Sequence, residues 1–215
     1  RRADGPGRIF HLAYDKDELT VLANWPVANR IADPMNWGLG KGDNYEGLVC
    51  IPLDGERCQL VLGERGGSKS HPRGALITGT LDLDAGTLTW QPADTDMALS
   101  SPGQWIEPKS PRDVGDLWYD ERDQSIWTAA TEDPGDQGPF RSILWQVCTV
   151  GEVDPETGLR TLVAMENPIA AYTVDGHKVE AISAPPANVP HAYLSIGAED
   201  EDYGGTFRGL YRPVQ

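Results

Sequence analysis

The feature that most constrains the fold is a phrase that occurs three times along the 215-residue chain. Each copy opens with a carboxylate that lies beside a small residue or directly before an apolar run. The copies start at 44–49, 114–119 and 178–183. After a turn, a second apolar strand follows in every copy, at 59–63, 125–130 and 192–196. Such self-similarity is typical of repeat architectures, in which each copy is one unit of supersecondary structure.

Two further strands follow in each of the first two copies. They lie at 75–83 and 87–90 in the first copy, and at 142–150 and 159–163 in the second. Gly and Asp at the bends supply the positive φ and the side-chain caps that hairpins need. Repeated four-stranded antiparallel units indicate an all-β fold, a β-propeller or partial propeller. The blades would span about 44–91, 114–165 and 178–213 of a single domain, residues 1–215.

The third copy has one further strand, at 206–211, and so lacks its outer strand. We expect the N-terminal strands within 8–23 to supply it and to close the last blade. Three blades do not close a ring, since propellers have roughly four or more. Either 24–43 and 92–113 hide degenerate strands, or the chain is a fragment, or two chains pair in a homo-oligomer that completes the ring. A β-sandwich is the other candidate, but it does not explain the repeat.

The charge of the chain restricts its partners. Formal net charge is -15, from 33 acidic and 18 basic residues. A surface this negative repels phosphate backbones, which argues against nucleic acid and anionic membranes. The chain has no window of about 18 apolar residues, so we expect no membrane insertion. The acidic residues either attract cations or only keep the protein soluble.

The spacing of the cysteines indicates whether the protein is exported or stays in the cytosol. Cys50 and Cys58 flank Asp54-Gly55, and a three-residue loop centred on Asp54 would place them opposite each other, within reach of a disulfide. Cys148 is then left over. One bridge and one buried thiol fit a secreted or periplasmic protein, whereas three thiols fit a cytosolic one. We expect export.

The recurrent carboxylates are the candidate metal ligands. The first strand of a blade lines the central channel, so Glu46, Asp116 and Glu180 would converge near the axis. Acidic loops after the second strands would add a rim of acids, namely Glu64, Glu132, Glu199 and Asp200. Clustered carboxylates need a counter-charge, and calcium, Ca²⁺, supplies it through oxygen ligands alone. Alternatively, each acid accepts backbone N–H groups at a strand end or caps a turn.

Three further residues are candidates for ligand binding. Arg65 precedes two glycines and can present a guanidinium and free amides to an anion, although a salt bridge to a nearby acid is the alternative. His71 lies on the same long loop. His177 precedes the first strand of the third copy and could act as a ligand or a base. The chain has no Gly-x-Ser-x-Gly elbow and no His-Glu-x-x-His motif, so nucleophilic hydrolysis has no support from motifs.

Three short phrases resemble a known family. They are YEGL at 45–48, GERG at 63–66 and AEDEDYGG at 198–205. In these the chain resembles the phytase-like propellers, bacterial proteins described by an "esterase-like activity of phytase". The resemblance implies an exported propeller that calcium stabilises and that cleaves phosphoesters.

Two functional hypotheses follow. The first, which we prefer, is an exported acidic propeller without catalysis that binds a divalent cation and presents a loop face to a small-molecule or protein ligand. The second is a metal-dependent hydrolase of phosphoesters or lactones. In that enzyme the central carboxylates would hold the cation, and Glu64 or His177 would serve as base. A third role is assembly through open blade edges.

Overall fold

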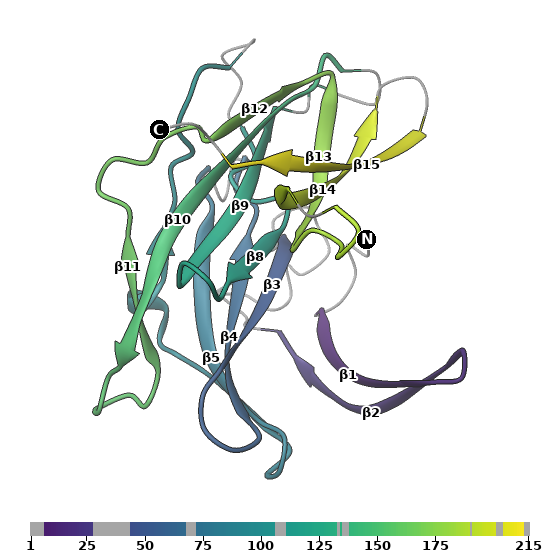
Figure 1. The fold of residues 1–215 in the computed structure, drawn as a ribbon. Coiled ribbons are helices and arrows are strands. Elements are labelled where there is room, and N and C mark those ends of the chain that lie inside the picture. Colours follow the sequence, from purple (N-terminus) through teal and green to yellow (C-terminus); the bar gives the residue numbers. More distant parts are fainter. Residues whose placement is uncertain are drawn as a thin grey trace.

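The structure is a computed structural model. It describes residues 7–27, 44–67, 72–105, 111–132, 134, 138–189, 191–200 and 204–212. These residues form antiparallel sheets and one short 3-10 helix, η2 (Ala93–Thr95), so the all-β prediction is confirmed (Figure 1). The described residues contain no helix with the length and apolar character needed to cross a bilayer.

The first sheet holds the first copy of the repeat. Its strands pair in chain order and are β3 (Tyr45–Pro52), β4 (Arg57–Glu64), β5 (Ala75–Asp82) and β6 (Thr87–Trp90). The short β7 (Met97–Ala98) pairs with β5 and lies within 92–113, one of the two stretches where the sequence left degenerate strands as an alternative. Gly55, with φ 58°, and Gly86, with φ 65°, occupy two of the turns, in backbone conformations that favour glycine.

The second and third sheets hold the other two copies. The second comprises β8 (Leu117–Asp120), β9 (Ser125–Glu132), β10 (Arg141–Val153) and β11 (Arg160–Ala164), and β12 (Tyr172–Asp175) also pairs with β10. The third comprises β13 (His177–Ser183), β14 (Ala192–Asp200) and β15 (Gly204–Tyr211). All three sheets are meanders, as the repeat predicts. The described strands do not form a closed ring.

Two apolar cores join the sheets. Between the first and second sheets, Ile51, Val61 and Leu76 pack with Ile126 and Ile143. Between the second and third sheets a separate core contains the buried side chains Trp127, Leu144, Val179, Leu194 and Ile196. Each such large side chain stabilises the fold by roughly 1.5–3 kcal/mol through burial. The sheets therefore stack in chain order.

Glycine allows the first two sheets to approach closely. A Cβ on Gly47 would lie 2.6 Å from Cγ of Leu117, and a Cβ on Gly63 would lie 2.6 Å from Cγ1 of Val114. Side chains at these two positions would force the sheets apart.

The N-terminal strands do not close the third sheet. β1 (Arg8–Asp15) and β2 (Glu18–Pro26) form a two-stranded sheet of their own, the N-terminal ribbon, and among the described strands β15 pairs only with β14. Ile9 and Trp25 instead bury against Cys58, Leu60 and Leu81 of the first sheet. The expected pairing fails because this apolar contact holds the ribbon beside the first sheet.

Cys50 and Cys58 form a disulfide, with their Cα atoms 5.8 Å apart, and Cys148 is a buried free thiol. The predicted register is wrong, because Pro52 pairs with Cys58 and the bridge runs diagonally. The reason is the turn, in which the Arg57 N–H donates to the Asp54 carbonyl oxygen (3.1 Å) and the hairpin centres on Gly55.

Candidate functional site

The recurrent carboxylates lie at one equivalent point of the repeat. Glu46 occupies the register shift between Tyr45 and Gly47 in β3, and Glu180 occupies the corresponding shift in β13. Each is the extra residue of a β-bulge, a device that re-aims a side chain.

Asp116 completes the set. The N–H of Gly115 donates to the carbonyl oxygen of Ala129 (2.8 Å), and Leu117 pairs with the adjacent Thr128. Asp116 therefore has no directly paired residue on β9. In the same way, Glu46 has none on β4 and Glu180 has none on β14.

Asp116 connects the second sheet to the third. Its Oδ2 accepts a hydrogen bond from the Ile182 N–H at 2.8 Å. Burial raises the pKa of Asp116, and the charge of Glu180 raises it further, while hydrogen bonds from the Ile182 and Leu117 backbones lower it in part. The net effect is a pKa above the usual aspartate value. This carboxylate has the role of accepting backbone N–H groups, the alternative to metal binding.

Basic side chains form ion pairs with the other two recurrent carboxylates, Glu46 and Glu180. Arg65 Nη1 lies 3.3 Å from Glu46 Oε1, so the structure shows the salt bridge that was the alternative to anion binding by Arg65. Lys178 Nζ lies 2.5 Å from Glu180 Oε1 and 3.4 Å from Glu199 Oε2.

The remaining predicted acids lie at the ends of second strands. Glu64 and Glu132 are buried, and Oε2 of Glu64 accepts the Gly66 N–H at 2.8 Å. Glu199 is exposed on β14.

His177 lies at the start of β13, where its Nδ1 is 3.1 Å from the Asp175 carbonyl oxygen. Asp200 belongs to β14 by its backbone, while its side chain and the whole of His71 lie outside the described residues.

The carboxylates expected to bind calcium do not cluster within the described residues. Within the described ranges, no three His, Cys, Asp or Glu side chains are close enough together to hold a metal ion. Calcium takes roughly six to eight oxygen ligands, whereas these acids are engaged by N–H groups, Arg65 and Lys178.

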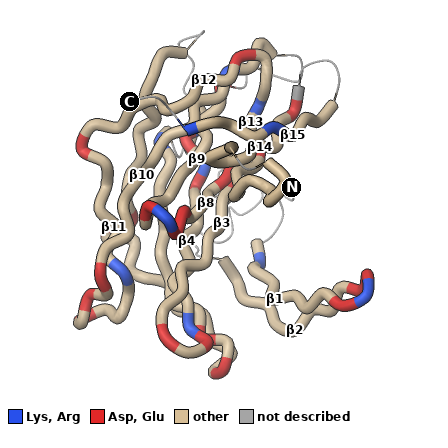
Figure 2. Tube along the Cα trace, in the orientation of Figure 1, with Lys and Arg blue, Asp and Glu red and all other residues tan. Residues whose placement is uncertain are grey.

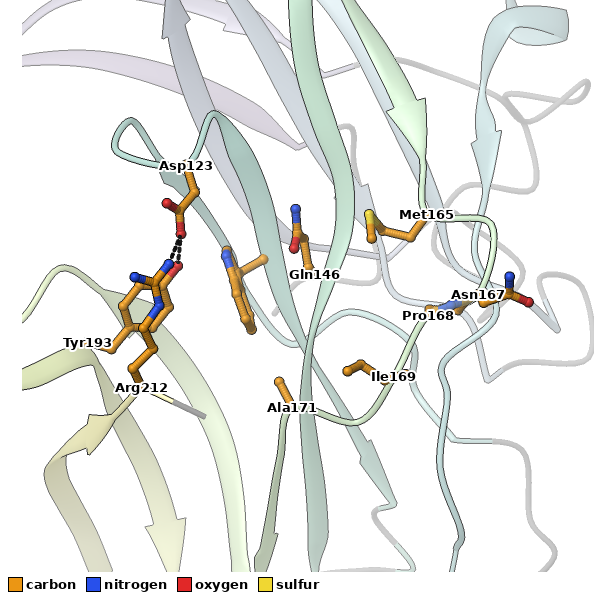
Figure 3. A pocket seen from close by; sticks show the side chains of 10 residues that line it. Asp123, Gln146, Met165, Asn167, Pro168, Ile169, Ala171, Tyr193 and Arg212 are labelled. Carbon is orange, nitrogen blue, oxygen red and sulfur yellow. Dashed lines mark hydrogen bonds and ion pairs between the residues drawn. The ribbon is translucent and has the colours of Figure 1, made fainter. Parts of the chain in front are cut away.

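A pocket of about 580 Å³ opens at the seam between the second and third sheets (Figure 3). Trp127 of β9 and Gln146 of β10 line one side, Tyr193 of β14 and Arg212 line the other, and the segment 165–171 between β11 and β12 borders it. The volume is within the usual range for small-molecule sites.

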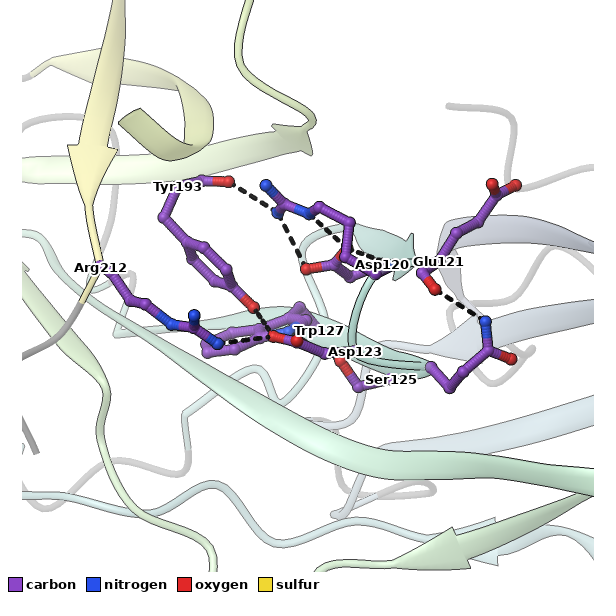
Figure 4. Close-up of polar contacts among 9 residues, drawn as sticks. Asp120, Glu121, Asp123, Ser125, Trp127, Tyr193 and Arg212 are labelled. Carbon is purple, nitrogen blue, oxygen red and sulfur yellow. Dashed lines mark hydrogen bonds and ion pairs between the residues drawn. The ribbon is translucent and has the colours of Figure 1, made fainter. Parts of the chain in front are cut away.

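Polar contacts connect the side chains of the Tyr193 wall of the pocket (Figure 4). The Tyr193 hydroxyl donates to Asp123 Oδ2 at 2.5 Å, and Arg212 Nη2 lies 3.2 Å from the same oxygen. The guanidinium carbons of Arg122 and Arg212 lie 4.6 and 5.2 Å from the centroid of the Tyr193 ring. Burial raises the pKa of Tyr193, and its hydrogen bond to Asp123 raises it further, so the phenol stays protonated.

Asp120 contacts this wall through Arg122. It is buried and binds Arg122 in a bidentate manner, at 2.8 and 2.9 Å, and Arg122 also donates to the Tyr193 carbonyl oxygen. Burial raises the pKa of Asp120, but interactions with Arg122 and Tyr193 outweigh it and leave the pKa below its usual value.

Trp127 and two amides make up the rest of the pocket. The Trp127 ring meets Tyr193 edge to face, with centroids 5.8 Å apart, and its N–H donates to Ser125. The side-chain amides of Gln146, half-buried, and Asn167, exposed, make no hydrogen bond within the described part of the chain. They are left to pair with water or a ligand.

No family model, curated protein or solved structure matches the chain. Five of the lining residues, at 123, 127, 146, 193 and 212, come from three strands, a turn and the C-terminal segment, and they share no spacing. No pattern in the sequence indicated that these residues meet.

Proposed function

We propose that the three sheets are blades of a β-propeller, and that the pocket between the second and third sheets binds a small neutral ligand of the carbohydrate class without catalysis. The meander order and the bulged carboxylate at the same point of each first strand support the propeller. So does the adjacency of the first strands, because a Cβ on Gly47 would lie 2.8 Å from the Leu117 nitrogen.

The two unpaired amides beside an aromatic wall carry the proposal. A carboxamide both donates and accepts, which matches the hydroxyl groups of a sugar. Gln146 and Asn167 flank a surface formed by Trp127, Met165 and Ile169, against which the C–H face of a sugar ring can pack.

Charge favours a neutral ligand. Arg212 is already paired with Asp123, so an anion would have to compete with that carboxylate. The formal charge of -15 opposes anions further. A cation would likewise have to compete for Asp123, because Oδ2 of this carboxylate accepts from both Tyr193 and Arg212.

The same contacts favour binding over turnover. Nucleophilic catalysis needs a nucleophile with an adjacent base that can take its proton. The Tyr193 hydroxyl donates to Asp123, but its pKa is raised, so it is a poor nucleophile near neutral pH. Export remains part of the proposal, and the Cys50–Cys58 disulfide supports it, since such bonds persist in oxidising compartments.

The experiment is a binding titration with defined sugars. Glucose, xylose, N-acetylglucosamine, cellobiose and maltose would be titrated against the protein, with Trp fluorescence and calorimetry as readouts. We expect at least one to bind, and Gln146→Leu and Asn167→Ala each to weaken it about fivefold to tenfold, the effect of about one hydrogen bond.

The matched control is Asn188→Ala, an exposed amide in another turn with no described partner, which should bind like the wild type. Two outcomes contradict the proposal. In one, no sugar binds at up to about 10 mM, a limit set by a binding free energy of under about 3 kcal/mol. In the other, the pocket variants bind as tightly as Asn188→Ala.

A further inference from the structure

The N-terminal ribbon exposes an apolar face. In a two-stranded antiparallel sheet, residues that pair directly point to the same side. Leu12 pairs with Val21 and Tyr14 with Leu19, and Phe10 lies on the same side of β1. These five side chains are between 46% and 68% exposed. A soluble monomer rarely leaves so many large apolar side chains together on one surface.

Both edges of the ribbon are also open. Among the described strands, β1 and β2 pair only with each other, and Figure 1 shows the ribbon reaching away from the three sheets. A lone two-stranded ribbon is marginally stable in water, and open strand edges are templates for pairing with another chain.

The third sheet presents an open edge that matches. It has three strands, whereas the first and second sheets each have four in register with a fifth attached, and its β15 pairs only with β14 within the described residues. Phe207 and Tyr211 on β15 are 61% and 69% exposed. The third sheet therefore combines a missing outer strand with exposed aromatic side chains.

Charge distinguishes the two surfaces. β15 carries Arg208, and Arg212 follows it, with no acid anywhere in 204–212 of this strongly acidic chain. The ribbon turn carries Asp15, Asp17 and Glu18 around a single Lys16, as Figure 2 shows at its tip. The ribbon and β15 are thus of opposite charge.

We propose that the ribbon of one copy adds to the β15 edge of a second copy, so that two chains exchange ribbons in a two-fold dimer. Main-chain hydrogen bonds between the open edges and burial of the apolar face beside Phe207 stabilise the contact. Ile9 and Trp25 anchor the ribbon on the first sheet, and the second sheet separates that sheet from the third. This arrangement favours pairing between copies over pairing within one. An anionic lipid surface fits poorly, because the chain carries a charge of -15.

The test is the mass of the full chain in solution, measured by sedimentation velocity over a concentration series. We expect a dimer of twice 23.4 kDa, with a dissociation constant of about 10 µM or lower. Leu12→Lys combined with Val21→Lys should weaken the dimer at least about tenfold, because it places two charges on the apolar face. The matched control is Val163→Lys, which alters a side chain 53% exposed on β11 and should leave the dimer intact.

Charge reversal tests the orientation. Arg208→Glu should weaken the dimer, and the addition of Glu18→Arg should restore it in the double variant. A wild type that is monomeric at about 100 µM would overturn the proposal and indicate that another molecule covers the ribbon. A dimer that survives both the Leu12/Val21 pair and Arg208→Glu would overturn it too, since the copies would then meet elsewhere.

Discussion

Replacing Gln59 with Leu should destabilise the protein by about 2–4 kcal/mol, because this amide joins the first two sheets. Gln59 is 1% exposed. Its Nε2 donates to the Arg160 carbonyl oxygen (3.2 Å), and its Oε1 accepts the Arg160 N–H (2.7 Å), so one amide satisfies both backbone groups of a residue on the neighbouring sheet.

The magnitude follows from what the substitution leaves behind. Leucine has nearly the volume of glutamine, so little cavity forms, but the Arg160 N–H and carbonyl oxygen both lose their partner. A buried polar group without a partner costs about 1–3 kcal/mol, and two of them exceed the gain from burying the leucine methyl groups. For a chain of this size, each kcal/mol lowers Tm by about 2–4 °C.

The assay is urea unfolding followed by Trp fluorescence, and we expect a lower midpoint with an unchanged slope. Gln146→Leu is the matched control, because it makes the same change at an amide without a described partner, and it should alter stability by less than about 0.5 kcal/mol. Gln59→Glu should be intermediate, since it keeps the acceptor for the Arg160 N–H and sets a carboxylate against the carbonyl oxygen. If Gln59→Leu were as stable as the control, the sheet-to-sheet role of this amide would be refuted.

Three other predictions concern titration and metal. Burial raises the pKa of Cys148 to about 12, so a thiol reagent at about pH 8 should label it only after unfolding; rapid labelling of the native protein would contradict its burial. Glu180→Gln should lower the pKa of Asp116, measured by carboxyl NMR titration, because it removes a negative charge that raises that pKa; an unchanged value would separate the two carboxylates. Calcium added to chelator-treated protein should move Tm by less than about 1 °C, since Glu46 and Glu199 already pair with cations of the chain; a larger rise would support the calcium hypothesis.

Local sequence patterns predicted most strands because hairpins depend on neighbouring residues. The predicted strand at 75–83 is β5, and the one at 142–150 lies within β10. A prediction that depended on exact turn geometry was wrong. The hairpin was expected to centre on Asp54, but it centres on Gly55, whose φ is positive. The short β12 was missed, although the turn dipeptide Asp175-Gly176 marks its end and Gly176 has a positive φ.

Long-range placement was beyond the sequence. The alternating segment at 8–14 is equally compatible with the third sheet and with a separate ribbon, and the burial of Trp25 on Leu60 decides between them. The pocket is similar, since Gln146 and Arg212 become neighbours only after the second and third sheets stack.

The recurrent carboxylates and the pocket residues differ in kind. A residue that recurs in every copy serves a structural feature that every copy has. Here that feature is the β-bulge at the first strand of each sheet. At this bulge, Asp116 accepts the Ile182 N–H from the third sheet, and Glu46 pairs with Arg65. A ligand site on a repeat scaffold instead needs side chains that occur at one contact between sheets and not at the others. Gln146 and Arg212 have no counterpart among the recurring phrases, so the search for function in this chain belongs to the residues that break the repeat.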